Sequence, residues 1–384
     1  MLIQFSLTNY RTFKETATLD LSEAKITEFP EHLYRDADGL GIIPMAAFYG
    51  ANGSGKTNFL QGLWTLRQLV LDAPNTAQKH NHFVWKDSKT PVEYDILFRI
   101  NDREYDYQLK LTPFEVVEEN LFGRDLNASQ FDVLFDRDSD GVFLCESWED
   151  VDVSTLPDQY PLLYFLGVQT LESELQNIIQ YFQNMIFLSE TNNSSITKEE
   201  TALKDILSIP TSKLDLLNHL KNMDFDITDI CQQENVLLVT HTIQGKSYVL
   251  SWDDESTGIR KLLRLLATLM KARKEHTLVL ADSPEITLHA KTLQYLYRYI
   301  AQNAAANSKS QVLFATHETS NMNHSIFRRD ELWLVEKEND GSSHLYTLAL
   351  FLKENGEKVR KDEVYFKQYL EGRYGAIPLI NFKS

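Results

Sequence analysis

The sequence predicts an α/β fold, and three patterns in the chain of 384 residues support this prediction. A glycine-rich segment at 50–57 separates an apolar, strand-like run at 44–49 from a helix-forming run at 58–66. Residues 92–145 contain segments in which apolar and polar residues alternate, as in strands that are buried on one face. Beyond residue 234, strand-like and helix-like segments follow one another, which indicates parallel strands joined by right-handed crossovers.

The glycine-rich segment reads GANGSGKT and fits the pattern G-x-x-x-x-G-K-T. In such a loop backbone N–H groups cradle phosphates, Lys56 reaches the β- and γ-phosphates, and the Thr57 hydroxyl binds Mg²⁺. A glycine-rich turn without a ligand is the alternative, but the flanking strand and helix are the context that phosphate binding requires. The segment therefore predicts a nucleoside triphosphate with Mg²⁺. The predicted contacts are Gly50, Asn52, Gly53, Ser54, Gly55, Lys56, Thr57 and Asn58.

The first part of the chain, residues 1–150, is expected to be a β-rich lobe around this loop. Residues 1–21 alternate apolar and polar side chains in a strand-like way. Residues 92–111 predict two strands joined at Asn101-Asp102, and the segments 131–135 and 142–145 predict another pair.

The middle part, residues 151–233, is expected to be a mainly helical insertion. Apolar residues recur at helical spacing over 171–220, with a polar break at 192–195. No heptad pattern persists over several repeats, so we expect a short insertion and no long coiled coil.

The last part, residues 234–384, is expected to complete a single two-lobed domain that spans 1–384. Its predicted strands are 236–239, 248–250, 277–280 and 311–315, and its predicted helices are 256–274 and 288–304. No low-complexity tract or linker separates the parts of the chain.

Four residues in this last part carry candidate chemistry for a nucleotide site. Asp282 follows the apolar strand 277–280, where a carboxylate can hold Mg²⁺, although it could also cap the next turn. Ser256 and Gly258 open a helix and could present a hydroxyl and backbone N–H groups to an anion, although Ser256 could be an ordinary N-cap. His317 follows the strand 311–315, at a carboxyl end that faces a ligand crevice, where it could sense a γ-phosphate.

Composition limits the remaining functions. The net charge of −17 argues against a surface that clamps DNA throughout, because such binding needs Lys and Arg on the phosphates. Basic residues are nevertheless concentrated at two places, which we interpret as a solvated helix face, with nucleic-acid contact as the alternative. These residues are Arg260, Lys261, Arg264, Lys271, Arg273 and Lys274, and the pair Arg328-Arg329.

The sequence also predicts a cytoplasmic setting without a membrane. No apolar run approaches the ~18 residues of a membrane span. The N-terminus lacks the charged start and cleavage site of a secretory signal. Cys145 and Cys231 have no metal-ligand spacing, and we interpret both as semi-buried thiols.

The order of these motifs resembles the ABC-type ATPase heads of the SMC and RecF class. In such a head Ser256 and Gly258 would belong to the signature motif, and Asp282 and His317 would be the Walker B carboxylate and the switch histidine. The segment 9–13 looks like the N-terminal strand turn of these heads, which implies a nucleotide contact for Arg11. The chain further resembles stand-alone bacterial ATPases found beside an RloB-type TOPRIM protein in abortive-infection phage defence, and its segments 328–337 and 369–378 look typical of that subgroup.

The resemblance implies a mode of assembly. Two heads would face each other as a homodimer or within a higher homo-oligomer, and ATP on Lys56 of one would be completed by Ser256 and Gly258 of the other. ATP would then set the association state. The leading hypothesis is an ATPase that holds or triggers a nuclease-like partner in anti-phage defence. A DNA repair or recombination ATPase that clamps DNA is the alternative.

One position departs from the pattern of these heads. Ser283 stands where they carry a glutamate after the Walker B aspartate, and a serine hydroxyl cannot act as a base near neutral pH. Loss of general-base help costs about 10²–10⁴ in rate, so we expect slow ATP hydrolysis. Glu285 is the candidate to supply the base, and a surface or supporting carboxylate is the preferred interpretation of this residue.

Overall fold

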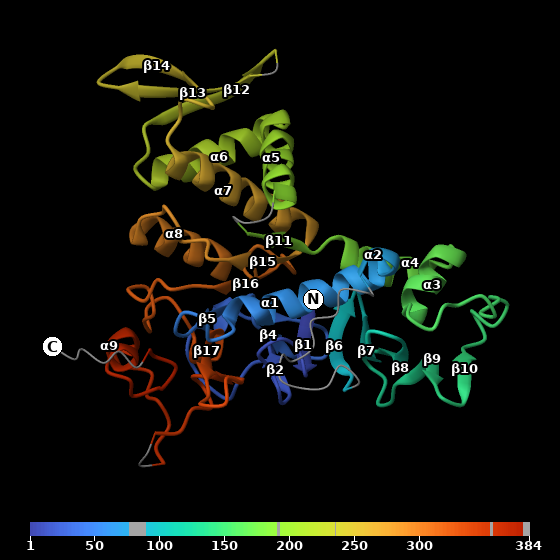
Figure 1. Ribbon diagram of the computed structural model, residues 1–384. Coiled ribbons are helices and arrows are strands. Elements are labelled where there is room, and N and C mark those ends of the chain that lie inside the picture. Colours follow the sequence, from blue (N-terminus) through green and yellow to red (C-terminus); the bar gives the residue numbers. More distant parts are fainter. Residues whose placement is uncertain (77–89, 190–192, 235, 354–355, 379–384) are drawn as a thin grey trace.

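Helix α1 (Lys56–Leu71) lies between two β-sheets, and the glycine-rich loop leads into its N-terminus (Figure 1). The computed structural model describes residues 1–76, 90–189, 193–234, 236–353 and 356–378. The α1 side chains of Phe59, Leu63 and Leu66 belong to one hydrophobic core with side chains from both sheets. Burial of these three side chains fixes the direction of the helix, and with it the position of the loop.

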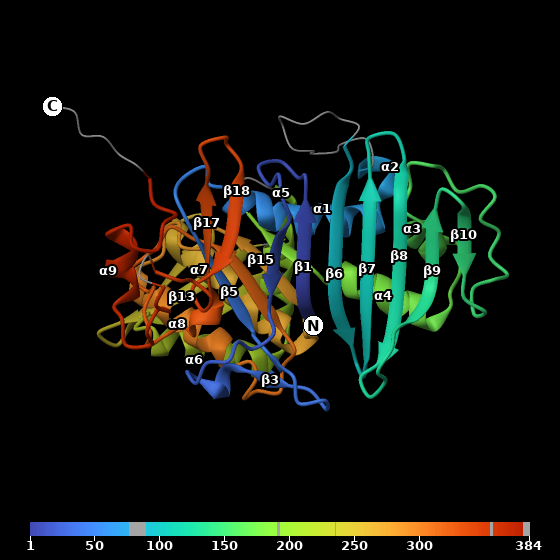
Figure 2. The ribbon, with the colours of Figure 1, turned by 90° about the horizontal axis from the view of Figure 1, so that it is seen from below.

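The first sheet is antiparallel, with strand order β10-β9-β8-β7-β6-β1-β2 (Figure 2). The predicted hairpins are confirmed, and β8 was missed because Glu118, Glu119 and Asn120 interrupt its apolar pattern. Glu119 is fully buried and accepts hydrogen bonds from the backbone N–H groups of Leu162 and Leu163, at 2.5 and 2.9 Å. The strands are β1 (Leu2–Thr8), β2 (Ala17–Asp20), β6 (Val92–Ile100), β7 (Arg103–Leu111), β8 (Val116–Asp125), β9 (Asp132–Asp138) and β10 (Gly141–Leu144).

The second sheet has the order β11-β15-β16-β5-β17-β18, and its pairs are parallel except for β17 with β18. The predicted parallel pairing of β15 with β16 is confirmed. Its strands are β5 (Met45–Tyr49), β11 (Ile186–Leu188), β15 (Leu278–Asp282), β16 (Gln311–Ala315), β17 (Leu332–Lys337) and β18 (Ser343–Thr347). The carboxyl ends of β5, β15 and β16 therefore meet at one edge of the sheet, where ligands bind in α/β folds.

Helices cover the face of this sheet that lies away from α1. Helices α7 (Thr257–Glu275) and α8 (Ala290–Ala301) share a core with β5, β15 and β16, and α5 and α6 pack on α7 (Figure 1). Helix α8 is shorter than the predicted 288–304: it begins after His289, whose side chain caps its start, and it ends at Ala301. At 19 residues α7 is the longest helix in the described ranges, in agreement with a short insertion and no long coiled coil.

The middle of the chain is mainly helical, as predicted, but differs in detail. Its helices are α3 (Leu162–Gln169), α4 (Ser173–Gln183), α5 (Asn193–Ser208) and α6 (Pro210–Asn222). The polar break expected at 192–195 is wrong for 193–195, where α5 begins, and residue 192 lies outside the described ranges. Strand β11 follows α4 and joins the parallel sheet beside β15.

A separate antiparallel sheet projects above α6 and α7 (Figure 1). It consists of β12 (Ile227–Gln233), β13 (Val236–Ile243) and β14 (Lys246–Ser251), of which β12 was not predicted. The buried His241 of β13 bonds the Glu255 carboxylate at 2.7 Å and the Asp226 carboxylate at 2.9 Å. This histidine fixes the sheet to the segment that leads into α7.

Four of the six basic residues of α7 do not form the solvated helix face that the sequence suggested. Lys261 is buried, and Arg264 lies 3.5 Å from the Glu199 carboxylate. Lys271 bonds Asp205 at 2.5 Å, and Arg273 bonds the side chain of Asn303 at 2.9 Å. These side chains hold α7 to its neighbouring segments.

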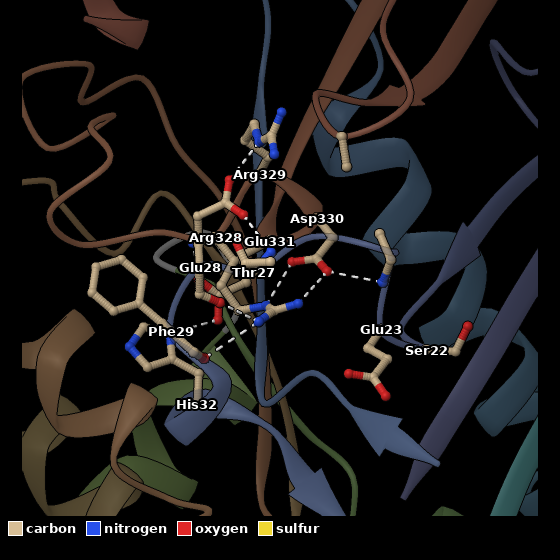
Figure 3. Close-up of polar contacts among 12 residues, drawn as sticks. Ser22, Glu23, Thr27, Glu28, Phe29, His32, Arg328, Arg329, Asp330 and Glu331 are labelled. Carbon is tan, nitrogen blue, oxygen red and sulfur yellow. Dashed lines mark hydrogen bonds and ion pairs between the residues drawn. The ribbon is translucent and has the colours of Figure 1, made fainter. Parts of the chain in front are cut away.

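The expectation of a basic surface cluster at Arg328-Arg329 is likewise wrong. Figure 3 shows both guanidinium groups between the 22–32 segment and the short 3₁₀ helix η2 (Arg329–Glu331). Arg328 is 1% exposed and donates to the Asp330 carboxylate at 2.8 and 2.7 Å. Arg329 donates to the Glu28 carboxylate at 2.6 Å. The two arginines therefore fasten this segment to the start of β17.

The remaining described elements are short. They are η1 (Pro30–His32), β3 (Tyr34–Arg35), β4 (Gly41–Ile42), α2 (Ala73–Thr76) and α9 (Tyr365–Leu370). Cys145 and Cys231 are free thiols of intermediate exposure, as predicted. Within the described ranges, no helix combines the length and the apolar character that crossing a bilayer needs.

Candidate nucleotide-binding site

The glycine-rich loop leaves the fully buried strand β5 and turns directly into α1. Gly55 has φ of 112°, and a Cβ there would lie 2.6 Å from the Ser343 hydroxyl and 2.8 Å from the Thr12 hydroxyl. A Cβ on Gly50 would lie 2.3 Å from the backbone oxygen of Val335. Only glycine satisfies both positions, because the turn needs the left-handed region and its backbone touches β17 and the Ser343 side chain.

Lys56 opens α1 and folds back over the loop. Its Nζ donates to the backbone oxygens of Gly50 at 2.7 Å and Ala51 at 3.0 Å. Burial lowers the pKa of Lys56 to about 8, and the charges of Glu285 and Asp282 oppose this effect. The ammonium group of Lys56 therefore lies over the glycine-rich loop, where the carboxylates of Glu285 and Asp282 act on its charge.

Thr57 and Asp282 come together as the sequence predicted. The Thr57 hydroxyl donates to the Asp282 carboxylate at 2.9 Å, across the ends of α1 and β15. A hydroxyl and a carboxylate at this separation are the donor set that Mg²⁺ takes beside a phosphate loop.

His317 and Glu285 form the far side of the site. The backbone N–H of His317 donates to Glu285 Oε1 at 2.7 Å. Glu285 Oε2 is buried without a hydrogen-bond partner, and the bond to His317 fits the supporting carboxylate that the sequence offered beside a surface one. Burial lowers the pKa of the His317 ring, and the charge of Lys56 acts in the same direction. Its surroundings therefore disfavour the charged form of the imidazole.

A pocket of ≈ 320 Å³ opens between the loop and the end of β16. The C-terminal segment forms its outer wall, and the backbone oxygen of Ala376 accepts a hydrogen bond from the Ala51 N–H at 3.0 Å. Sequence reasoning missed this wall, because no local pattern links residues so far apart in the chain. The lining residues are Tyr49, Gly50, Ala51, Asn52, Thr316, His317, Thr319, Tyr369 and Pro378.

A second pocket of ≈ 240 Å³ adjoins Asp282 on the side of α7. Leu188 and Ser189 line it from the end of β11, and Thr257 and Lys261 line it from α7. Lys261 also donates to the backbone oxygen of Ser283 at 3.4 Å. The turn after Asp282 is therefore held from both α7 and β16.

Arg11 and Asn58 lie side by side at the start of α1. Arg11 Nη1 donates to the Asn58 side chain at 3.2 Å, and Asn58 donates to the Thr12 hydroxyl at 3.1 Å. These hydrogen bonds hold the Arg11 guanidinium against the side chain of Asn58, the residue that follows Thr57. Ser54, also predicted to contact phosphate, has a buried hydroxyl without a hydrogen-bond partner.

Ser256 and Gly258 line neither pocket of their own chain. Ser256 is exposed and caps α7, since its hydroxyl accepts a hydrogen bond from the Ile259 N–H at 3.2 Å. Gly258 packs against the turn after β15, where a Cβ would lie 3.2 Å from the backbone oxygen of Thr287. The N-cap that the sequence left as an alternative is thus present.

Comparison with known proteins agrees with this geometry. A family described as "AAA domain, putative AbiEii toxin, Type IV TA system" matches residues 45–153 and 168–322, which is more than half of the chain. The chain belongs to this AAA domain family. The AAA domain match includes the glycine-rich loop, Asp282 and His317. It ends before β17, β18 and α9, so the C-terminal wall of the pocket lies outside the matched region.

Two solved structures are similar to this AAA domain protein. One is an SMC head domain from Thermotoga maritima, with a TM-score of 0.49, 12% identity, and coverage of 90% of this chain and 98% of that chain. The other is an Smc head domain from Pyrococcus furiosus bound to the C-terminal domain of ScpA, with a TM-score of 0.49, 11% identity, and coverage of 90% and 96%. No curated protein matches the chain.

Proposed function

We propose that the protein is an ATPase of the ABC head type that closes head to head on Mg·ATP and hydrolyses ATP slowly. The supporting observation is the convergence of Lys56, Thr57 and Asp282 at the carboxyl edge of the parallel sheet, with a 2.9 Å bond between the last two. Two features of the loop fit a bound triphosphate. The buried Ser54 hydroxyl has no hydrogen-bond partner within the protein, and the tight turn at Gly55 has no room for a Cβ.

Different residues of the site would bind the phosphates and the Mg²⁺. Lys56 would neutralise the β- and γ-phosphates, and the loop N–H groups would hold their oxygens. Thr57 and Asp282 would hold Mg²⁺, which supplies charge neutralisation and orientation of the phosphates when bound. Arg11, fixed by Asn58, adds a second cation at the helix start.

Glu285 is the residue that we propose takes the proton from the attacking water. Ser283 carries no base, whereas Glu285 Oε2 is buried and unpartnered at the edge of the site. The 2.7 Å bond from the His317 N–H orients the carboxylate.

The proposed assembly is supported by the place of Ser256 and Gly258 at the start of α7. Ser256 is exposed, and neither residue lines the two pockets of its own chain, so the Ser256 hydroxyl is accessible to ATP on a second copy. We propose a homodimer, or a higher homo-oligomer built from such pairs, that regulates a nuclease-like effector of the TOPRIM class in anti-phage defence. We place it in the cytoplasm, which the two free thiols favour.

The DNA-clamp alternative gains no support from the described residues. Several of the basic side chains that suggested it are buried or paired, as with Arg328 and Lys271. Salt-dependent binding of DNA to the purified protein would revive it.

Hydrolysis and oligomeric mass should be measured together on wild type, Lys56→Ala and Ser283→Glu, with and without Mg·ATP. We expect slow wild-type turnover, a rise in mass with Mg·ATP that Lys56→Ala lacks, and faster turnover in Ser283→Glu. A wild-type protein that binds no ATP, or binds it without any gain in mass, would refute the proposed function.

A further inference from the structure

Among the apolar surfaces that stay exposed in the described chain, two lie at opposite ends of one side of the molecule. The first is on β14 and the second is on α9, and Figure 1 shows both elements at the left, above and below the parallel sheet. Figure 2 keeps α9 and the neighbouring β13 on that same side. The carboxyl edge of the sheet, with the candidate nucleotide site, lies between them.

Strand β14 extends beyond the part of the sheet that packs on the body of the protein. Tyr248 and Leu250 pair with His241 and Val239 of β13, so all four side chains are on one face of the sheet. On β13 this face is buried against the body, whereas Tyr248 is 51% exposed and Leu250 is 38% exposed. Because β14 is the last strand of its sheet, its outer backbone groups also have no strand beside them in the described ranges.

Helix α9 is apolar on two faces. Tyr365 and Tyr369 are buried against the body, while Phe366 and Leu370, also four positions apart, point outward and are 37% and 60% exposed. The preceding Val364 is exposed as well. A helix with apolar side chains on both faces is expected to be covered on both.

Each surface adjoins one half of the composite site. Strand β14 ends at Ser251, shortly before Ser256 at the start of α7. Helix α9 contributes Tyr369 to the pocket beside the glycine-rich loop. In a head-to-head pair the start of α7 in one copy meets the loop of the other, and a twofold axis through the middle of this side would bring each β14 to the α9 of its partner.

We propose that the overhanging face of β14 in one copy covers the outer face of α9 in a second copy. This inference rests on the head-to-head pairing of the proposed function. The contact occurs twice in the pair and buries both apolar surfaces at once, and it is formed by residues 243–250 and 364–370. It gives the pair a specific contact that does not include the nucleotide.

The test uses Leu250→Lys and Leu370→Glu in the full chain, with mass measured by sedimentation in Mg·ATP. Each single variant should raise the dissociation constant of the pair at least about tenfold, because each places a charge at two apolar contacts. An equimolar mixture of the two variants should restore pairing, since one contact then joins the introduced lysine to the introduced glutamate and the other is unchanged. ATP binding by each monomer checks that the variants fold.

Leu171→Lys is the matched control, because Leu171 is 90% exposed and lies between α3 and α4, away from this side. It should pair as the wild type does. Single variants that pair like wild type, or a mixture that fails to recover pairing, would overturn the proposed contact. A wild type that gains no mass in Mg·ATP would instead refute the proposed function itself, so the two failures are distinguishable.

Discussion

The carboxylate of Glu285 is held by the backbone of His317 through a bond of 2.7 Å to Oε1, and its other oxygen is buried without a partner. The two residues follow neighbouring parallel strands, β15 and β16. One oxygen is therefore used to fix the side chain, and the second is free to accept a proton. This division of roles distinguishes Glu285 from a carboxylate that only balances charge.

Glu285→Gln should lower the hydrolysis rate by about 10²–10⁴ and leave ATP affinity nearly unchanged, because glutamine still accepts the His317 bond but cannot take a proton. Single-turnover hydrolysis and equilibrium ATP binding separate the two effects. Glu318→Gln is a suitable control from the segment after β16. Unchanged hydrolysis in Glu285→Gln would exclude this residue as the base.

ATP affinity should fall as the pH rises through about 8, the lowered pKa of Lys56. Below this pH the ammonium is present to bind phosphate, and above it the free protein must first recover a proton, at a cost of up to about tenfold in affinity for each pH unit. Titrations at pH 7, 8 and 9 measure the effect. Lys56→Ala should bind about 10–100-fold more weakly at pH 7. If wild type and Lys56→Ala change in parallel with pH, another group is responsible.

Gly55→Ala should abolish ATP binding and destabilise the fold by about 2 kcal/mol or more, since its Cβ would meet the Thr12 and Ser343 hydroxyls at φ of 112°. Gly53→Ala is the matched control. Gly53 also has positive φ, 75°, but open space around it, so we expect only the backbone cost of about 1 kcal/mol. Thermal unfolding with and without ATP compares the two, and equal losses would contradict the steric argument.

His241 should stabilise the protein most in mildly acidic solution. Burial disfavours its charge, but hydrogen bonds to Asp226 and Glu255 prevail and raise its pKa above the usual 6.5. The stabilisation is complete below pH 6.5 and is lost as the pH rises through the raised pKa. Denaturation should show that His241→Gln costs about 1 kcal/mol more at pH 6 than at pH 9. His344→Gln controls for loss of an exposed histidine, and an equal cost at both pH values would contradict the ion pairs.

Sequence reasoning located the parts of the site that are built from local patterns. The strand, loop and helix at 45–71 carry their own signature, and the apolar run before Asp282 predicted its position at a strand end. The pairing of Thr57 with Asp282 followed from the general order of strands in α/β sheets.

What the sequence could not predict depends on contacts between distant segments. Arg328 is buried because it also donates to the backbone oxygens of Glu28 and Phe29, which lie about 300 residues earlier in the chain, and no local pattern indicates that contact. The burial of Glu285 depends in the same way on His317, and strand β8 was hidden because its Glu119 is satisfied by N–H groups of α3.

The hydrogen bond from Ala51 to Ala376 has a consequence for the order in which the protein matures. A ribosome releases the glycine-rich loop well before β17 and residues 369–378, which support the loop and wall its pocket. A chain that stops between the two carries the loop without its finished surroundings. In the proposed ATPase such a chain would lack part of the nucleotide pocket, so that the loop alone would not let it join a nucleotide-controlled assembly.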